Sequence, residues 1–170
     1  LDHHGARSDD DDHGSRRAGG PDKVRQVRDL GADVAVDYRE PGWPERVRAA
    51  LGERKPTLLL DGVGGEVGRA AFEMLDTGGR IVMFGWTSGE VTPFTSADIA
   101  AGSLSVVWVT GPRMVKRYGG LRGLETRSLE EAAAGRLVPL VHPPFPLADA
   151  AEAHRALEGR RTAGKVVLAP

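Results

Sequence analysis

From Pro21 onward, short apolar runs alternate with segments in which apolar residues recur every three or four positions. Two of the runs, at 57–60 and 81–84, are apolar without alternation, which is typical of strands buried on both faces of a parallel sheet. Strands that alternate with helices of about ten residues indicate βαβ units with right-handed crossovers. The middle of the chain is therefore predicted to be a doubly wound α/β sheet. The predicted strands lie at 32–37, 57–60, 81–84 and 104–109, and the predicted helices at 21–30, 44–51 and 66–75.

After Gly111 this alternation of strands and helices stops. Ser128 and Glu131 have the spacing of a capping box, which predicts a helix that begins there and runs to about Leu137. A proline-rich connector then leads to a helix with an apolar face over 147–157, and a closing strand is predicted at 165–168.

The first twenty residues differ from the rest of the chain. They contain one Leu and no other large apolar residue, and Asp9 to Asp12 form an unbroken acidic run. Such a segment cannot bury enough surface to offset its ordering entropy, so we expect a disordered tail. His3, His4 and His13 beside these aspartates could suggest a metal site, but metals prefer preorganised ligands. A solvated tail is the preferred interpretation.

Composition narrows the classes of function. Apolar residues make up 40% of the chain and charged residues 28%, which is compatible with a folded core. Lys and Arg (23) nearly balance Asp and Glu (24), which argues against a nucleic-acid or anionic-membrane surface. No segment reaches the roughly 20 apolar residues of a membrane span, and no secretory signal is visible. With no Cys there is no disulfide and no thiolate ligand for zinc. We expect a cytoplasmic protein without nucleic-acid or membrane partners.

Two glycine-rich turns follow successive predicted strands. The first, Asp61–Gly68, does not match the dinucleotide fingerprint G-x-G-x-x-G, because the pattern from Gly62 requires glycine where Val67 stands. It is either a tight strand-to-helix connection or a ligand-binding turn at the carboxyl edge of the sheet. The second turn, Gly85–Gly89, is weak evidence by itself, since such loops are commonly rich in Gly and Ser. Two such turns after neighbouring parallel strands favour a ligand edge.

Four stretches, in this order, resemble the medium-chain dehydrogenase/reductase superfamily. They are most similar to the zinc-independent quinone oxidoreductases, a branch of the zinc-binding dehydrogenase family, and the resemblance covers residues 20–170. Any one of them alone would be poor evidence, and their order makes the resemblance specific. The stretches are PDKVRQVRDLGADVAVDYRE, LLLDGVGG, GGRIVMFG and PLADAAEAHRALEGRRTAGKVVLAP.

Members of this family are longer and begin with a catalytic barrel domain. The resemblance therefore implies an incomplete Rossmann-like sheet, without its first strand and glycine-rich turn, plus a C-terminal helix and strand that belong to the absent catalytic domain. The family's second strand should fall just before Gly20, where HGSRRAGG is not typical of a strand. The implied division is a tail at 1–20, a partial NADP-binding Rossmann domain at 21–135 and a C-terminal segment at 136–170.

The resemblance also implies a set of cofactor-binding residues. Lys23 and Tyr38 match positions that hold the 2′-phosphate of NADPH, and an ammonium group and a phenol suit a dianionic phosphate. An exposed helix lysine and an ordinary strand-end aromatic are the alternatives. Arg160 matches a basic residue that reaches back to the cofactor, or is one of several solvated arginines. The remaining matched contacts are Val63, Phe84, Gly85, Trp86, Thr87 and Val109.

Two histidines carry no predicted role. His154 shares an apolar helix face and is expected to be partly buried, and His142 lies in the proline-rich connector without an evident partner. In the family, hydride passes from NADPH to a quinone or conjugated carbonyl, and the protein mainly positions the two reactants. We therefore expect no catalytic side chain in this chain, and no zinc.

The resemblance implies the cofactor-domain fragment of an NADPH-dependent oxidoreductase acting on a quinone or enone. The alternative is a non-catalytic remnant, or a dinucleotide-binding or interaction module without turnover. Without the glycine-rich turn the pyrophosphate loses its principal anion site, and without a barrel domain nothing covers the nicotinamide. NADPH binding is thus expected to be weak or lost. A homodimer through the edge strand 104–109 is a further expectation.

Overall fold

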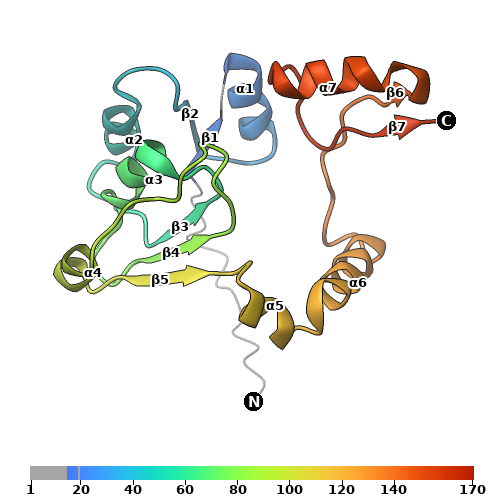
Figure 1. The fold of residues 1–170 in the computed structure, drawn as a ribbon. Coiled ribbons are helices and arrows are strands. Elements are labelled where there is room, and N and C mark those ends of the chain that lie inside the picture. The colour runs from blue at the N-terminus through green and yellow to red at the C-terminus, as the bar shows by residue number, and fades with distance from the viewer. Residues whose placement is uncertain (1–14, 19) are drawn as a thin grey trace. The chain divides into compact units, whose positions relative to one another are not determined.

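The computed structural model describes residues 15–18 and 20–170. The chain divides into two compact units, the first ending at Thr110 and the second beginning at Gly111. Figure 1 shows the elements of both.

The first unit alternates strands and helices, as the apolar pattern predicts. All of its strand pairs are parallel: β1 pairs with β2, and β4 lies between β3 and β5. The parallel α/β fold is thus confirmed. The elements are β1 (Ser15–Ala18), α1 (Pro21–Asp29), β2 (Val34–Asp37), α2 (Trp43–Leu51), β3 (Leu58–Asp61), α3 (Gly65–Phe72), β4 (Arg80–Met83), α4 (Ser96–Gly102) and β5 (Ser105–Trp108).

Local sequence signals set the ends of these helices. Pro21 occupies the first turn of α1, where its missing N–H costs nothing, and the helix ends before Gly31, whose φ is +91°. Helix α4 begins with a capping box in which Thr95 accepts from the backbone N–H of Asp98, and the Asp98 carboxylate accepts from the backbone N–H of Thr95. The predicted strands and helices of this unit are found within a few residues of their expected ends.

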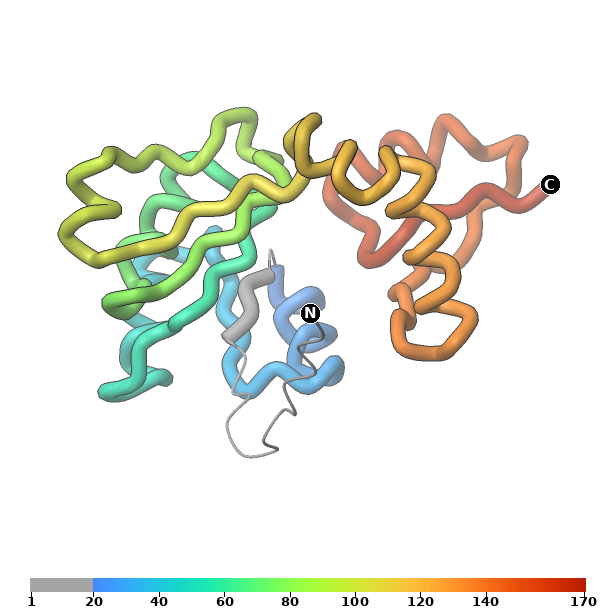
Figure 2. Tube along the Cα trace, turned by 90° about the horizontal axis from the view of Figure 1, so that it is seen from below, coloured from blue at the N-terminus to red at the C-terminus, as the bar shows by residue number. Residues whose placement is uncertain are grey.

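The core of the first unit lies on one face of the three-stranded sheet, whose strands run side by side in Figure 2. Residues of α2, α3 and the segment after α3 pack there against alternate residues of β3 and β4, and Ile81 at the centre is fully buried. The buried members of this cluster are Trp43, Val47, Leu59, Ala71, Phe72, Met74, Ile81 and Met83.

The opposite face of β3 corrects one prediction. Leu58 and Leu60 are 53% and 61% exposed, whereas Leu59 between them is buried. The expectation that this strand is buried on both faces is therefore wrong for this chain. The physical reason is that the buried cluster covers only the face that carries Leu59, and no described residue buries the side chains that point the other way.

Strand β1 corrects a second prediction. Residues Ser15–Ala18 pair in parallel with β2, in a register that runs from Ser15 opposite Val34 to Ala18 opposite Asp37. The expectation that no strand precedes Gly20 is wrong, because backbone pairing with β2 can hold a segment that lacks an apolar run. Residues 1–14 and 19 of the expected disordered tail, which include His3, His4, His13 and Asp9 to Asp12, lie outside the described residues.

The second unit contains mainly helices. Its two short strands pair in parallel, and Val141 and Lys165 form an isolated bridge nearby. The predicted closing strand at 165–168 is thus reduced to one bridge and a two-residue strand. The elements are α5 (Pro112–Arg117), α6 (Gly120–Ala133), β6 (Phe145–Pro146), the 3₁₀ turn η1 (Leu147–Asp149), α7 (Ala150–Glu158) and β7 (Leu168–Ala169).

Helix α6 corrects the predicted capping box. The helix begins eight residues before Ser128, at Gly120, so Ser128 lies inside it. Its hydroxyl donates to the carbonyl oxygen of Leu124 at 2.9 Å, one turn back, instead of accepting from a free N–H group. The S-x-x-E spacing is present, but the preceding residues already form helix, so no N-terminus needs a cap there.

Candidate functional site

The residues that follow β3, β4 and β5 meet at one edge of the sheet. Asp61, Met83 and Trp108 are in register at the carboxyl ends of the three strands. The backbone N–H of Phe84 donates to the carbonyl of Asp61 at 2.9 Å, and that of Val109 donates to the carbonyl of Met83 at 3.1 Å. The structure therefore brings together six of the predicted site residues: Val63, Phe84, Gly85, Trp86, Thr87 and Val109.

The two glycine-rich turns are joined to each other by backbone hydrogen bonds. Thr87 N–H donates to the carbonyl of Gly62 at 3.2 Å, and Ser88 N–H donates to the carbonyl of Val63 at 2.9 Å. Gly65 N–H donates in the other direction, to the carbonyl of Glu90 at 2.9 Å. The loops therefore form one connected surface and not two independent connections.

Gly64 is needed for this close approach, and Gly62 lies directly against the ring of Phe84. A Cβ on Gly64 would lie 2.0 Å from the carbonyl oxygen of Glu90, and its φ of +73° is one that other residues rarely adopt. A Cβ on Gly62 would lie 2.6 Å from the ring of Phe84. A tight strand-to-helix connection is thus enough to explain why glycine stands at these two positions. A ligand could still bind at the same edge.

Exposed aromatic rings stand beside the joined loops. Phe84 and Trp86 are 51% and 49% exposed. The rings of Trp86 and Trp108 lie 5.1 Å apart between centroids, tilted by 38°. Large exposed rings at the carboxyl edge of a parallel sheet are a surface on which a flat ring can stack.

Lys23 and Tyr38 lie at the carboxyl edge of the other strand pair. Lys23 is half-buried in the first turn of α1, which follows β1. Tyr38 follows β2 directly, and its half-buried ring packs against the core cluster. A hydrogen bond of 2.8 Å from the backbone N–H of Gly20 to Asp37 ties the start of α1 to the end of β2. Both residues are therefore at the same edge of this pair.

An ion pair beside them was not anticipated from the sequence. The carboxylate of Asp37 accepts from Nε and Nη2 of Arg39 at 3.2 and 3.0 Å, and also from the backbone N–H groups of Arg39 and Gly20. The hydrogen bond from the Arg39 side chain is the main reason that the pKa of Asp37 is lowered from its ordinary value. The sequence D-Y-R, with an acid and a base two residues apart at the end of a predicted strand, could have indicated this ion pair.

Arg160 and the two histidines are in the second unit. Arg160 is exposed after α7, with a φ of +54°, and its N–H donates to the carbonyl of Leu157 at 3.0 Å. His154 is exposed, because Ala153 and Ala156 occupy the buried face of α7, so the expectation of partial burial is wrong. His142 does have partners: its ring stacks on Phe145 with centroids 5.4 Å apart, and Nδ1 lies 2.9 Å from the carbonyl of Pro143.

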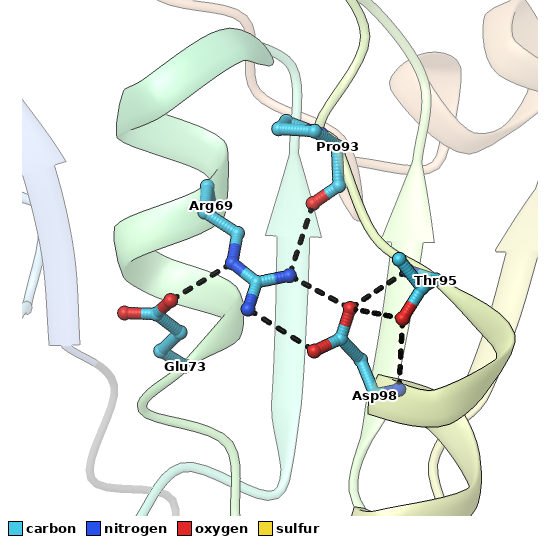
Figure 3. A network of polar contacts seen from close by, with 5 residues as sticks. All are labelled: Arg69, Glu73, Pro93, Thr95 and Asp98. Atoms are coloured by element: carbon cyan, nitrogen blue, oxygen red, sulfur yellow. Dashed lines mark hydrogen bonds and ion pairs between the residues drawn. The ribbon is translucent and has the colours of Figure 1, made fainter.

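A second polar cluster connects α3 to α4 (Figure 3). Arg69 donates to both oxygens of Asp98, at 2.9 and 3.1 Å, and to Glu73 at 2.8 Å. Its side chain also reaches the carbonyl of Pro93 at 3.4 Å. The paired guanidinium lowers the pKa of Asp98 far below its ordinary value, with help from the N–H and hydroxyl of Thr95. Because Arg69 lies on α3 and Asp98 lies on α4, their paired hydrogen bonds tie the two helices together.

Across residues 15–18 and 20–170, no group of three or more His, Cys, Asp and Glu residues is arranged to hold a metal ion. None of the described helices has the length and apolar content to cross a membrane.

Comparison with known proteins decides the family. The family model described as zinc-binding dehydrogenase matches residues 30–168. The chain belongs to this family. The resemblance to the medium-chain dehydrogenase/reductase superfamily, in its quinone oxidoreductase-like branch, is thereby confirmed. The incomplete Rossmann-like parallel fold is confirmed as well, by the solved structures that resemble the chain.

Individual members of this family show how much of a relative the chain represents. The quinone oxidoreductase of Salmonella typhimurium is 30% identical over 165 residues, which cover 89% of this chain and 47% of that protein. The crystal structure of Escherichia coli quinone oxidoreductase complexed with NADPH has a TM-score of 0.72 and 30% identity, over 92% of this chain and 49% of that one. An NAD-dependent alcohol dehydrogenase has a TM-score of 0.72 and 33% identity, over 92% and 43%. The chain thus spans about half the length of the relatives it matches.

Proposed function

We propose that this chain is the NADPH-binding part of an oxidoreductase that transfers hydride to a quinone or conjugated carbonyl. The observation that carries the proposal is the carboxyl edge of β3–β4–β5, where two interlocked glycine-rich loops lie beside exposed aromatic rings. This is the edge at which parallel α/β sheets bind ligands. A relative of known structure, the E. coli quinone oxidoreductase, is complexed with NADPH and supports the choice of cofactor.

The residues at the two edges suit different parts of such a cofactor. Lys23 and Tyr38 supply an ammonium and a phenol for the 2′-phosphate, and the charge of Asp37 nearby is offset by Arg39, so it repels a phosphate less. When bound, NADPH supplies the hydride. This chain's part would be to orient the nicotinamide half with Val63, Phe84, Gly85, Trp86, Thr87 and Val109. Arg160, the remaining residue that the resemblance implies, belongs to the second unit.

A non-catalytic role is the second candidate. The sequence contains no G-x-G-x-x-G turn, and the chain spans under half of the relative with the known NADPH complex. The helix N-terminus that such a turn opens is a major source of phosphate affinity. We therefore propose that this chain alone binds NADPH weakly and turns over no quinone, as a cofactor-binding module would.

The test is a titration with NADPH and an assay of NADPH oxidation with benzoquinone. Binding is followed by the fluorescence of the three tryptophans, of which Trp86 and Trp108 lie at the proposed site. We expect saturable quenching with a dissociation constant in the high micromolar range, and no oxidation above the rate without protein. No saturable change up to about 1 mM NADPH would contradict cofactor binding by this chain. Protein-dependent oxidation would contradict the non-catalytic candidate.

A further inference from the structure

Asp61 is a buried carboxylate that no step of the proposed function uses. It ends β3, is only 2% exposed, and is one of the two largest side chains that the described residues bury completely. Its Oδ1 accepts the backbone N–H groups of Val63 and Gly64 at 2.9 and 3.0 Å. Its Oδ2 accepts the hydroxyl of Thr92. The buried carboxylate therefore holds the backbone of the first glycine-rich turn in place.

Thr92 connects this carboxylate to the second loop. It is as deeply buried as Asp61 and lies two residues after Glu90, whose carbonyl already accepts the N–H of Gly65. The Asp61–Thr92 hydrogen bond thus joins segments 31 residues apart in the sequence. Burying a charged group is costly unless hydrogen bonds satisfy it, and here the donors come from both loops.

Gly68 of α3 shows that the fold makes room for this contact. A Cβ on Gly68 would lie 2.0 Å from Oγ1 of Thr92 and 2.9 Å from Oδ2 of Asp61. The φ of Gly68 is an ordinary helical one. Glycine is therefore required here because a side chain would collide with Thr92 and Asp61, and not because of the backbone conformation. A helix glycine, a buried acid and a buried hydroxyl are therefore arranged around one hydrogen bond.

We propose that Asp61 and Thr92 are positioning residues, which hold the loops 61–65 and 85–92 in the one arrangement that can receive a cofactor. Neither side chain touches the ligand surface: Asp61 acts through the backbone of Val63 and Gly64, and Thr92 acts through Asp61. The statement about the cofactor rests on the proposed function, whereas the statement about loop geometry does not.

The test compares Thr92→Val with Thr92→Ser and with Thr77→Val, the same change at an exposed turn residue. Thr92→Val keeps the shape of the side chain and leaves Oδ2 of Asp61 without its donor. We expect the amides of Val63, Gly64, Gly65 and Ser88 to exchange about tenfold faster, the effect of losing a hydrogen bond to a charged group. Exchange at Ile81 should stay unchanged. Thr92→Ser should restore the slow rates, and Thr77→Val should not alter them.

The same variants are titrated with NADPH. If the wild type binds, Thr92→Val should weaken binding about tenfold, and Thr92→Ser should restore it. If the wild type does not bind, cofactor binding by this chain is refuted and the exchange rates still decide the positioning role. Equal acceleration at Ile81 and at the loops would show a contribution to global stability only and would overturn the proposal. Unchanged loop exchange in Thr92→Val would overturn it too.

Discussion

Lys23 is the residue at which the proposed preference for NADPH over NADH can be tested most directly. It lies in the first turn of α1, whose preceding residue Gly20 is hydrogen-bonded to Asp37. A free carboxylate at this edge would favour an unphosphorylated ribose, but Asp37 is paired with Arg39. Since the similar structures include an NADPH complex and an NAD-dependent enzyme, we base the proposed preference for NADPH on the charges at this edge.

Replacing Lys23 with Ala should weaken NADPH binding about tenfold and leave NADH binding nearly unchanged, because only NADPH carries the phosphate that a charged hydrogen bond would hold. Parallel titrations of both cofactors, followed by tryptophan fluorescence, measure this. Lys55→Ala is the matched control, since Lys55 is exposed just before β3, at the opposite end of the strand from the site. Equal losses for the two cofactors would contradict the assignment of Lys23 to the 2′-phosphate.

At the scale of residues, the sequence showed which residue types stand at the site but not which side chains contact one another. Val63, Phe84 and Trp86 could be placed at one edge because the carboxyl ends of parallel strands meet at the same edge of a sheet. Asp61 was visible as the acid that ends an apolar run. Its link to Thr92 was not, since it depends on how a loop after β4 folds back. Arg39 was missed for the same reason: its contact with Asp37 depends on side-chain geometry at a strand end.

At the scale of elements, the periodicity of apolar residues predicted the helices and strands that pack against the core. Helices α2 and α3 were both predicted, and part of each apolar face is buried: Trp43 and Val47 in α2, and Ala71 in α3. Strand β1 has no such signal, because pairing with the backbone of β2 defines it. Helix α6 buries none of its residues completely, so no apolar face marked its start at Gly120. The capping-box spacing further along the sequence therefore gave the wrong start. Helix α1 also buries no residue completely, yet it was predicted, because Pro21 and Gly31 mark its two ends.

The ion pair between α3 and α4 predicts a dependence of stability on pH. Arg69 and Thr95 hold the pKa of Asp98 below its value in the unfolded chain. The carboxylate therefore stabilises the fold fully above the unfolded pKa of about 3.9, and this contribution is lost as the pH falls below that value. Asp98→Asn should lower the melting temperature at pH 7, and its curve should approach that of the wild type as the pH falls below about 4.

Glu73→Gln is the control for this experiment. It removes the second partner of Arg69 but leaves the Arg69–Asp98 pair and the capping box of α4 in place. Its melting temperature should keep the acid dependence of the wild type. A constant difference between Asp98→Asn and the wild type from pH 7 to pH 3 would contradict the linkage between this carboxylate and stability. Thermal melts followed by circular dichroism are sufficient.

At the scale of the whole molecule, the two units are unequal in how much they bury. The core cluster is confined to the first unit, while among the described residues of the second unit only Ala153, Ala156 and Thr162 are buried. The first unit also leaves apolar surface open at Leu58 and Leu60 of β3. Apolar side chains and unpaired strand edges are the surfaces through which chains associate. The exposed apolar side chains and the strand edges therefore lead to predictions about the oligomeric state.

Strand β5 offers such an edge. Of the described strands, it pairs only with β4. The N–H groups of Ser105 and Val109 donate to β4, so the alternate N–H groups, those of Val106 and Trp108, point away from it. Two copies of the chain can then extend the sheet from edge to edge. We expect the chain to be a dimer by sedimentation equilibrium, and we expect Val107→Lys to shift it to monomer, because lysine on an edge strand opposes strand pairing.

Leu60→Lys is the control that separates the edge from the open apolar face. Leu60, Val82 and Val107 occupy one row of the sheet, so both substitutions place a lysine on the same face, but on opposite strands of the sheet. If pairing along β5 holds the dimer, only Val107→Lys dissociates it. If the apolar face holds it, both variants dissociate it, and if the edge of β3 holds it, only Leu60→Lys does. A wild-type chain that stays monomeric at high concentration would contradict all three routes, because then neither the edges nor the face would drive association.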